Sequence, residues 1–166
     1  MKLRKLGIAA LLGASLQFGA ALASEVGQPA PTFDLPGASG QVRLADLRGK
    51  LVYVDFWASW CGPCKQSFPW MNEMQAKYGG QGLQIVGIAV DNKRADAEQF
   101  LKETPAKFTV AFDTQGESPK SYRIKGMPSS YLIAPDGRVL YAHAGFREQD
   151  KRELEERIRQ ALPKKP

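Results

Sequence analysis

Residues 51–65 read LVYVDFWASWCGPCK, and this stretch decides the fold. Its first seven residues are aliphatic or aromatic except for Asp55, which is typical of a strand buried on both faces of a sheet. The apolar side chains that follow recur at helical spacing as far as Tyr78, where two glycines end the pattern. The stretch therefore predicts a buried strand followed directly by a helix, with Cys61 and Cys64 at the junction.

The predicted position of the cysteines at a helix start has a chemical consequence. Unpaired backbone N–H groups and the helix dipole stabilise negative charge there, so we expect a lowered pKa for Cys61. A thiolate is the form that attacks disulfides, which makes Cys61 the expected nucleophile. Cys64 follows one turn later and can close a disulfide with it. Pro63 suits the first turn, where its missing N–H costs nothing.

An inert structural bridge and half of a zinc site are the alternative interpretations of the cysteine pair. A disulfide that closes so short a loop constrains little of the unfolded chain. A zinc site needs four ligands, whereas the sequence offers two cysteines and one histidine, His143, which we interpret as structural. We therefore predict redox chemistry at the cysteines that requires neither a metal nor an organic cofactor.

The rest of the chain alternates between strand and helix patterns. Residues 24–36 read as an extended lead-in anchored by Phe33 and Leu35, and residues 46–49 as a turn. A tight-turn signal at residues 135–137 joins the last two strands in a hairpin. Further strands are predicted at 41–44, 83–90, 108–112, 130–134 and 138–143, and helices at 95–102, 118–122 and 149–162. This order predicts an α/β sandwich on a mixed sheet.

The first 23 residues have the composition of a secretory signal peptide. A basic start precedes an apolar segment, and Ala21-Leu-Ala23 offers a small-residue cleavage site. We therefore assign residues 1–23 to a signal peptide and residues 24–166 to a single domain. The alternative is an uncleaved membrane anchor, because residues 6–23 approach spanning length, although three glycines and Gln17 make them a poor span.

The basic character of the chain belongs in large part to this first segment. Lys2, Arg4 and Lys5 supply three of the six net positive charges. The remaining excess is spread along the chain, with no basic patch interleaved with aromatic residues. The sequence therefore gives no indication of nucleic-acid binding.

The motif region resembles a known family. Residues 54–65 resemble the active-site segment of thioredoxins, and Pro69 falls where those proteins kink the following helix. Gly126-Met-Pro128 is similar to their second signature, a loop whose proline is cis. The lead-in at residues 27–35, the stretch at 44–49 and the signal peptide point to the exported TlpA/ResA-type branch. The resemblance implies a thioredoxin-like sandwich, a mixed central sheet flanked by helices, with an N-terminal extension.

The resemblance also implies a substrate-binding surface. Pro128 would hold the backbone of Met127 toward the cysteine pair, so that an extended substrate strand can pair with it. The flexible Met127 side chain suits varied partners. Trp60, Gly62 and Pro63 would complete this surface, with Trp60 exposed.

Asp55 is the third candidate catalytic residue. Burial in an apolar strand would raise its pKa and make it a plausible proton acceptor for Cys64. The alternative is an acid that reaches solvent or makes an internal hydrogen bond. Thioredoxins place a lysine beside this acid, and alignment of the next strand puts Gly87 at that position.

These observations predict an exported thiol–disulfide oxidoreductase that exchanges disulfides with protein substrates. The Gly-Pro dipeptide between the cysteines resembles that of reducing thioredoxins and favours the reducing direction. The related branch implies apocytochrome c as one substrate, a membrane-bound electron donor, and a periplasmic or otherwise extracytoplasmic location.

Four alternatives remain: a disulfide oxidant, an isomerase, a thiol peroxidase and a non-enzymatic binding domain. The peroxidase would resemble peroxiredoxins, but these need a proline and a threonine where this chain has Val54 and Ala58.

Overall fold

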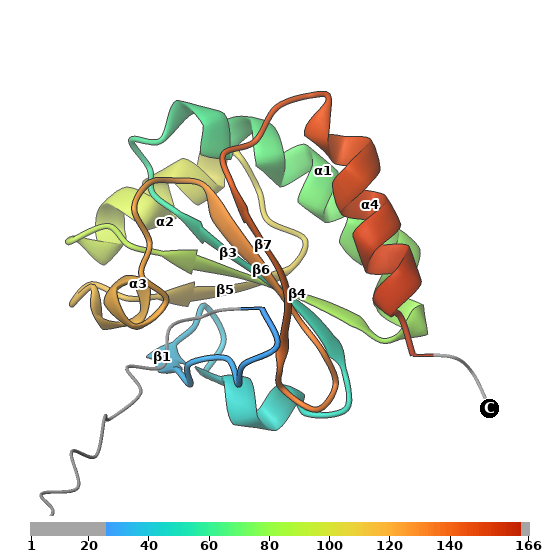
Figure 1. Cartoon of the computed structure of the whole chain (residues 1–166). Coiled ribbons are helices and arrows are strands. Elements are labelled where there is room, and N and C mark those ends of the chain that lie inside the picture. Colours follow the sequence, from blue (N-terminus) through green and yellow to red (C-terminus); the bar gives the residue numbers. More distant parts are fainter. Residues whose placement is uncertain (1–25, 164–166) are drawn as a thin grey trace, which may run out of the picture.

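The computed structural model describes residues 26–163, and their centre is a five-stranded mixed sheet (Figure 1). The strand order is β5-β4-β3-β6-β7. The central strand β3 runs parallel to β4 and antiparallel to β6, while β5 is parallel to β4 and β7 antiparallel to β6. The bounds are β3 (Leu51–Trp57), β4 (Leu83–Ala89), β5 (Thr109–Phe112), β6 (Ser129–Ile133) and β7 (Val139–Ala144).

Helices cover both faces of this sheet, as Figure 1 shows. One face packs against three helices: α1 (Gly62–Tyr78), α2 (Arg94–Glu103) and α4 (Asp150–Ala161). The other packs against the segment that follows the short helix α3 (Glu117–Ser121) and against the N-terminal part of the described chain. That part contains β1 (Asp34–Pro36), β2 (Gln41–Arg43) and the 3-10 helix η1 (Leu44–Leu47), and a second 3-10 turn, η2 (Gly79–Gln81), follows α1. The predicted thioredoxin-like sandwich is confirmed.

Strand β3 is buried on both faces, as its composition predicted. Tyr53 and Trp57 belong to the apolar core under α1, whereas Val54 and Phe56 belong to the core on the opposite face. Burying a large apolar side chain stabilises the fold by roughly 1.5–3 kcal/mol, so this strand anchors both layers. The same alternation places Asp55 on the α1 face, within an apolar layer.

The predicted elements agree with the structure except in the lead-in. Helix and strand ends shift by one or two residues, and Phe33 is buried as expected. The lead-in, expected to be merely extended, forms β1 and pairs antiparallel with β2. An ion pair of 2.9 Å between Asp34 Oδ2 and Arg43 Nε spans this pairing. The 3-10 helix η1, in which Leu44 is buried, extends into the first two residues of the turn expected at 46–49.

The predicted signal peptide, residues 1–23, lies outside the described residues. Within residues 26–163, no helix combines the length and the apolar character needed to cross a bilayer.

Candidate active site

Cys61 and Cys64 form a disulfide at the start of α1, with their Cα atoms 5.3 Å apart. Cys61 is the N-cap residue, in extended backbone geometry, and its N–H donates to the carbonyl of Ala58 at 3.0 Å. Its sulfur accepts a hydrogen bond from the backbone N–H of Cys64 at 3.3 Å. Cys61 is 6% exposed and Cys64 is fully buried. The outer sulfur is thus the one that a partner protein can reach.

A contact that the sequence analysis missed holds the loop before Cys61. The carboxylate of Asp91, just beyond β4, accepts the backbone N–H of Ser59 at 3.0 and 3.2 Å and its hydroxyl at 2.5 Å. Asp91 is only 4% exposed. The carboxyl ends of the parallel strands β3 and β4 meet at one edge of the sheet. A polar residue just after each strand is therefore the sequence feature that could have indicated this contact.

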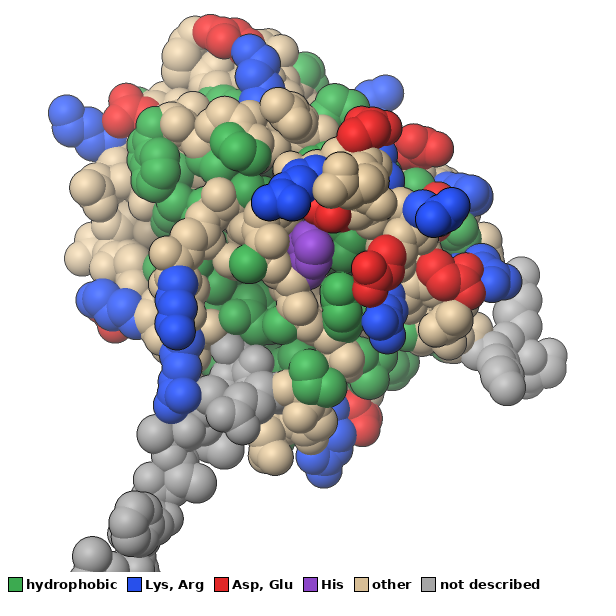
Figure 2. All heavy atoms as spheres, turned by 45° about the horizontal axis from the view of Figure 1, so that its top comes forward, with side chains coloured by type: hydrophobic (Ala, Val, Ile, Leu, Met, Phe, Trp, Pro, Cys, Tyr) green, Lys and Arg blue, Asp and Glu red, His purple; other side chains and the backbone are tan. Residues whose placement is uncertain are grey.

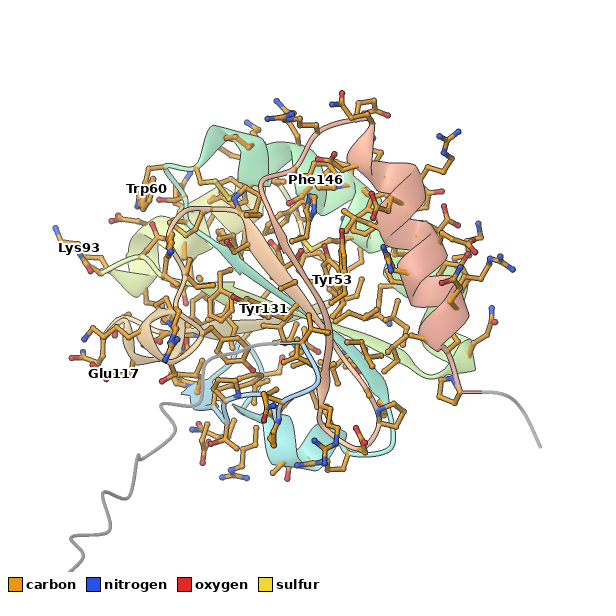
Figure 3. The ribbon with its side chains drawn as sticks, viewed as in Figure 1. Tyr53, Trp60, Lys93, Glu117, Tyr131 and Phe146 are labelled. Atoms are coloured by element: carbon orange, nitrogen blue, oxygen red, sulfur yellow. A yellow bond between two sulfur atoms is a disulfide. The ribbon has the colours of Figure 1, made fainter. Side chains whose placement is uncertain are left out.

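The surface around Cys61 has one large exposed aromatic residue. Trp60 is 71% exposed and projects from the loop before α1, on the same side of the molecule as Lys93 (Figure 3). Trp57 is fully buried beneath the site, with its ring centroid 5.0 Å from that of Phe68. The exposure of Trp60 agrees with the prediction. Gly62 is exposed as well, and a Cβ added there would meet no atom within 4 Å.

The loop before β6 contains the predicted cis peptide bond, between Met127 and Pro128. Two hydrogen bonds hold this loop: the carbonyl of Pro128 accepts the N–H of Gly145 at 2.8 Å, and the Ser129 hydroxyl donates to the carbonyl of Gly126 at 2.7 Å. Met127 is half-buried and packs against the core cluster that contains both cysteines. Within the described residues its backbone N–H and carbonyl make no hydrogen bond, which leaves them open to an added strand.

Asp55 is 2% exposed on the α1 face of the sheet. Burial raises the pKa of its carboxyl well above the usual range. Gly87 lies opposite it on β4, as the alignment predicted, and a Cβ there would come within 2.9 Å of Phe108 and 3.1 Å of the Trp57 indole nitrogen. A lysine therefore does not fit at this position.

Two polar atoms of β3 are buried without a hydrogen-bond partner among the described residues: Oδ2 of Asp55 and the indole nitrogen of Trp57. Buried polar groups are rarely left unpaired, and those that are often have a functional role. Oδ2 of Asp55 is one of these unpaired atoms, which makes Asp55 a candidate for such a role.

Two further polar residues, Lys65 and His143, lie outside this buried cluster. Lys65 is exposed and forms no ion pair within the described part of the chain. His143 lies on β7, and its Nε2 atom is 3.5 Å from Oδ2 of Asp150. The imidazole, purple in Figure 2, reaches the molecular surface among charged side chains.

The cysteine pair lies at the first turn of the helix that follows the central strand, and only Cys61 is accessible to a partner protein. This arrangement defines a thiol–disulfide oxidoreductase of thioredoxin-like fold. Comparison with known proteins supports this class. The thiol–disulfide oxidoreductase ResA of Bacillus thuringiensis subsp. konkukian is 37% identical over 140 residues, which cover 84% of this chain and 80% of the relative. ResA of Bacillus subtilis (strain 168) is 34% identical over 120 residues, 72% of this chain and 67% of the relative.

Solved structures and a family match lead to the same class. A Chlorobium tepidum structure, described as a thiol:disulfide interchange protein DsbE, superposes with a TM-score of 0.82. It is 55% identical and covers 84% of this chain and 99% of its own. The AhpC/TSA family matches residues 26–142. The chain belongs to this family, and it is a thiol–disulfide oxidoreductase similar to the ResA proteins.

Proposed function

We propose that this oxidoreductase reduces disulfides of exported proteins, with Cys61 as the attacking residue and Cys64 as the resolving one. The observation that carries the proposal is the asymmetry of the pair. Cys61, at the helix N-terminus, is still 6% exposed, whereas Cys64, one turn later, is 0% exposed. Only the outer sulfur can meet a second protein, and only the inner one is protected from it.

The reaction begins with the pair reduced. The Cys61 thiolate attacks one sulfur of a substrate disulfide, and the other substrate sulfur leaves as a thiolate that takes a proton from water. Asp55 then accepts the proton of the Cys64 thiol, and the Cys64 sulfur attacks Cys61. The mixed disulfide breaks, the second substrate thiolate leaves, and the Cys61–Cys64 bond forms. The substrate has gained two electrons and the enzyme pair has lost them.

The other candidate residues form the substrate surface. An extended substrate segment pairs with the free backbone of Met127, which the cis Pro128 orients. Trp60 lies beside this segment with an exposed aromatic face, and the small exposed turn of Gly62 and Pro63 allows close approach to Cys61.

We also propose the direction of the reaction, the location of the enzyme and its partners. The Gly-Pro dipeptide is that of reducing thioredoxins, whose reduction potentials are about −270 mV, whereas those of strong oxidants are about −120 mV. We place the enzyme outside the cytoplasm, exported by residues 1–23. There it would prepare cysteines such as those of apocytochrome c and receive electrons from a membrane-bound donor.

A trapping experiment tests the attacking role of Cys61. In Cys64→Ser, an attacked substrate stays attached to Cys61 because nothing resolves it, and mass spectrometry then identifies it. Cys61→Ser is the matched control and should trap no substrate. Equal trapping by both variants, or by neither, would contradict the assignment. A redox titration of the intact pair against glutathione tests the direction, and a potential near that of the strong oxidants would overturn it.

Two rival functions have their own tests. The AhpC/TSA match makes a peroxidase the first rival, but Val54 and Ala58 replace the proline and threonine expected of one. We expect hydrogen peroxide consumption no faster than that of an ordinary free thiol. The second rival is a binding domain in which the cysteines are incidental. Full activity of Cys61→Ser in the producing cell would favour it.

A further inference from the structure

Three polar side chains lie in one row across the sheet, within an otherwise apolar layer. Asp55 on β3 is paired with Ser130 on β6, and Ser130 is paired with His143 on β7. Directly opposed residues of antiparallel strands project to the same face, with Cβ atoms about 4.5–5.5 Å apart. The row thus leads from the most buried acid of the site to the edge strand of the sheet.

The middle of the row is buried. Ser130 is 4% exposed, and its hydroxyl lowers the pKa of the Tyr53 phenol, which burial raises by more. On the other side of Asp55 the row ends, because Gly87 offers no side chain. Ser130 is therefore the only polar side chain directly beside Asp55 on the neighbouring strands.

The outer end of the row reaches water. The His143 side chain is 20% exposed, and its buried Nε2 atom lies 3.5 Å from Oδ2 of Asp150, whose side chain is 21% exposed. The Tyr141 ring stacks on the imidazole with centroids 6.2 Å apart. Besides Asp150, α4 contributes Glu153, which accepts the Tyr141 hydroxyl at 3.2 Å. Figure 2 shows the imidazole at the surface of the molecule.

We infer that Ser130 and His143 pass the proton of Asp55 to and from solvent during each catalytic cycle. This inference rests on the proposed role of Asp55 as proton acceptor for Cys64. An acid that is 2% exposed cannot exchange its proton directly with bulk water, so it needs a polar route. The Ser130 hydroxyl can accept one proton and donate another, and an imidazole can do the same with its two nitrogens.

The proton transfers begin when Cys64 attacks the mixed disulfide. The Cys64 proton moves to the Asp55 carboxylate, the Cys61–Cys64 bond forms and the substrate thiolate leaves. Asp55 then donates its proton to the Ser130 oxygen while the Ser130 hydroxyl proton moves to His143. From the imidazole the proton reaches water beside Asp150, and the row returns to its starting state. Reduction of the enzyme pair reverses these transfers.

The kinetic test compares four variants in the full mature chain: Asp55→Asn, Ser130→Ala, His143→Gln and Tyr141→Phe. The rate of the resolving step is measured in single turnovers with a disulfide-containing peptide, across pH and at several buffer concentrations. We expect His143→Gln and Ser130→Ala to slow this step about tenfold. Asp55→Asn should slow it more, because it removes the group that accepts the thiol proton itself. Added imidazole buffer should restore much of the His143→Gln rate. Tyr141→Phe removes a polar atom from the same strand and face, and its rate should not change.

The outcomes separate this inference from the proposed function. If Asp55→Asn leaves the resolving rate and its pH dependence unchanged, the role of Asp55 fails, and the relay fails with it. If Asp55→Asn slows the step while Ser130→Ala and His143→Gln do not, the relay alone is overturned. A slow His143→Gln variant that imidazole cannot rescue also overturns it, because the loss is then structural.

A second measurement does not depend on the folding of the relay variants. The chain has a single histidine, so one Cε1–H resonance reports on His143 without ambiguity. We expect the chemical shift of this resonance at a fixed pH to differ between the oxidised protein and its Asp55→Asn variant, and between the oxidised and reduced protein. The same chemical shift in all three would show that Asp55 and His143 are uncoupled and would overturn the inference.

Discussion

The sulfur of Cys61 accepts a hydrogen bond from the backbone N–H of Cys64 across 3.3 Å. Cys61 thus occupies the N-cap position that serine, threonine, asparagine and aspartate usually take, and its sulfur serves as the capping acceptor. An N–H that donates to the sulfur favours its ionised form over the protonated one. The helix dipole acts in the same direction. The first turn of α1 is therefore arranged for a thiolate.

The first prediction concerns the acidity of the two thiols. In Cys64→Ser the backbone N–H of residue 64 is retained, so the remaining Cys61 thiol should titrate below the ordinary value of about 8.5. Thiolate absorbance and the pH dependence of alkylation measure this. Cys61→Ser is the matched control: its remaining thiol, at fully buried Cys64, should be alkylated far more slowly. Equal titration of the two thiols would contradict the assignment of Cys61 as nucleophile.

The second prediction uses Gly62, the first residue of α1. A side chain fits there because an added Cβ meets nothing within 4 Å. Gly62→Lys should stabilise the Cys61 thiolate and Gly62→Glu should destabilise it, by about 0.3–1 kcal/mol each. Since a stabilised thiolate favours the reduced pair, the lysine variant should have the higher reduction potential. Both variants replace the same glycine, so any effect of losing glycine is common to them. A shift of the reduction potential in the same direction in both variants would rule out the electrostatic explanation.

The third prediction concerns the contact between Ser59 and Asp91. Asp91→Ala leaves the half-buried Ser59 N–H without this partner and should lower the free energy of unfolding by about 1–3 kcal/mol, whereas Ser59→Ala should cost about 0.5–1.5 kcal/mol. Urea unfolding measures both. Iodide quenching of Trp60, the exposed tryptophan, should change in the Asp91 variant if the loop moves. Asp96→Ala removes an exposed acid of α2 and should change stability by less than about 0.5 kcal/mol. A similar loss in that control would contradict a specific role for Asp91.

Local patterns were sufficient to predict the centre of this fold. Residues 51–65 predicted β3, the start of α1 and the position of the cysteines, because a buried strand and a helical period can both be recognised within a short continuous segment. The alignment that placed Gly87 beside Asp55 was confirmed by the register of β3 and β4. Each of these features depends on a short segment or on one pair of adjacent parallel strands.

Features that depend on long-range register were missed. The hydrogen bonds from Ser59 to Asp91 join residues 32 positions apart, and the only signal for them is that each residue follows one of two adjacent parallel strands. The pairing of His143 with Ser130 was not predicted, because it depends on how the hairpin closes. The hairpin contains a register shift between Leu132 and Ile133, which a count of residues back from the turn does not anticipate. Pairing of β1 with β2 also lay beyond the local pattern, since three-residue strands carry almost no periodicity.

Two buried aspartates have opposite environments, and this difference sets up the last prediction. Burial raises the pKa of Asp55, whose Oδ2 atom has no partner in the described part of the chain. At Asp113 burial acts in the same direction, but hydrogen bonds from Ser118 and Gly116 outweigh it and lower the pKa. The backbone N–H groups of these two residues lie 2.6 and 2.8 Å from the Asp113 carboxylate. Burial thus shifts Asp55 toward its neutral form, whereas hydrogen bonds shift Asp113 toward its charged form.

Replacement of each aspartate by asparagine should therefore change stability with opposite sign. The folded protein holds the Asp55 proton more tightly than the unfolded chain, so wild-type stability falls as pH rises from about 4 through the folded-state pKa. Asp55→Asn removes this loss, and the oxidised variant should be more stable than wild type at pH 8, on the order of 1–3 kcal/mol, with the gain vanishing toward pH 4. Asp113 contributes stability above its unfolded pKa, so Asp113→Asn should be less stable than wild type at pH 8. Urea unfolding of the oxidised proteins at pH 4, 6 and 8 measures both differences. Destabilisation by Asp55→Asn at pH 8 would mean that its carboxylate has a charged partner, and the environment assigned to it would be wrong.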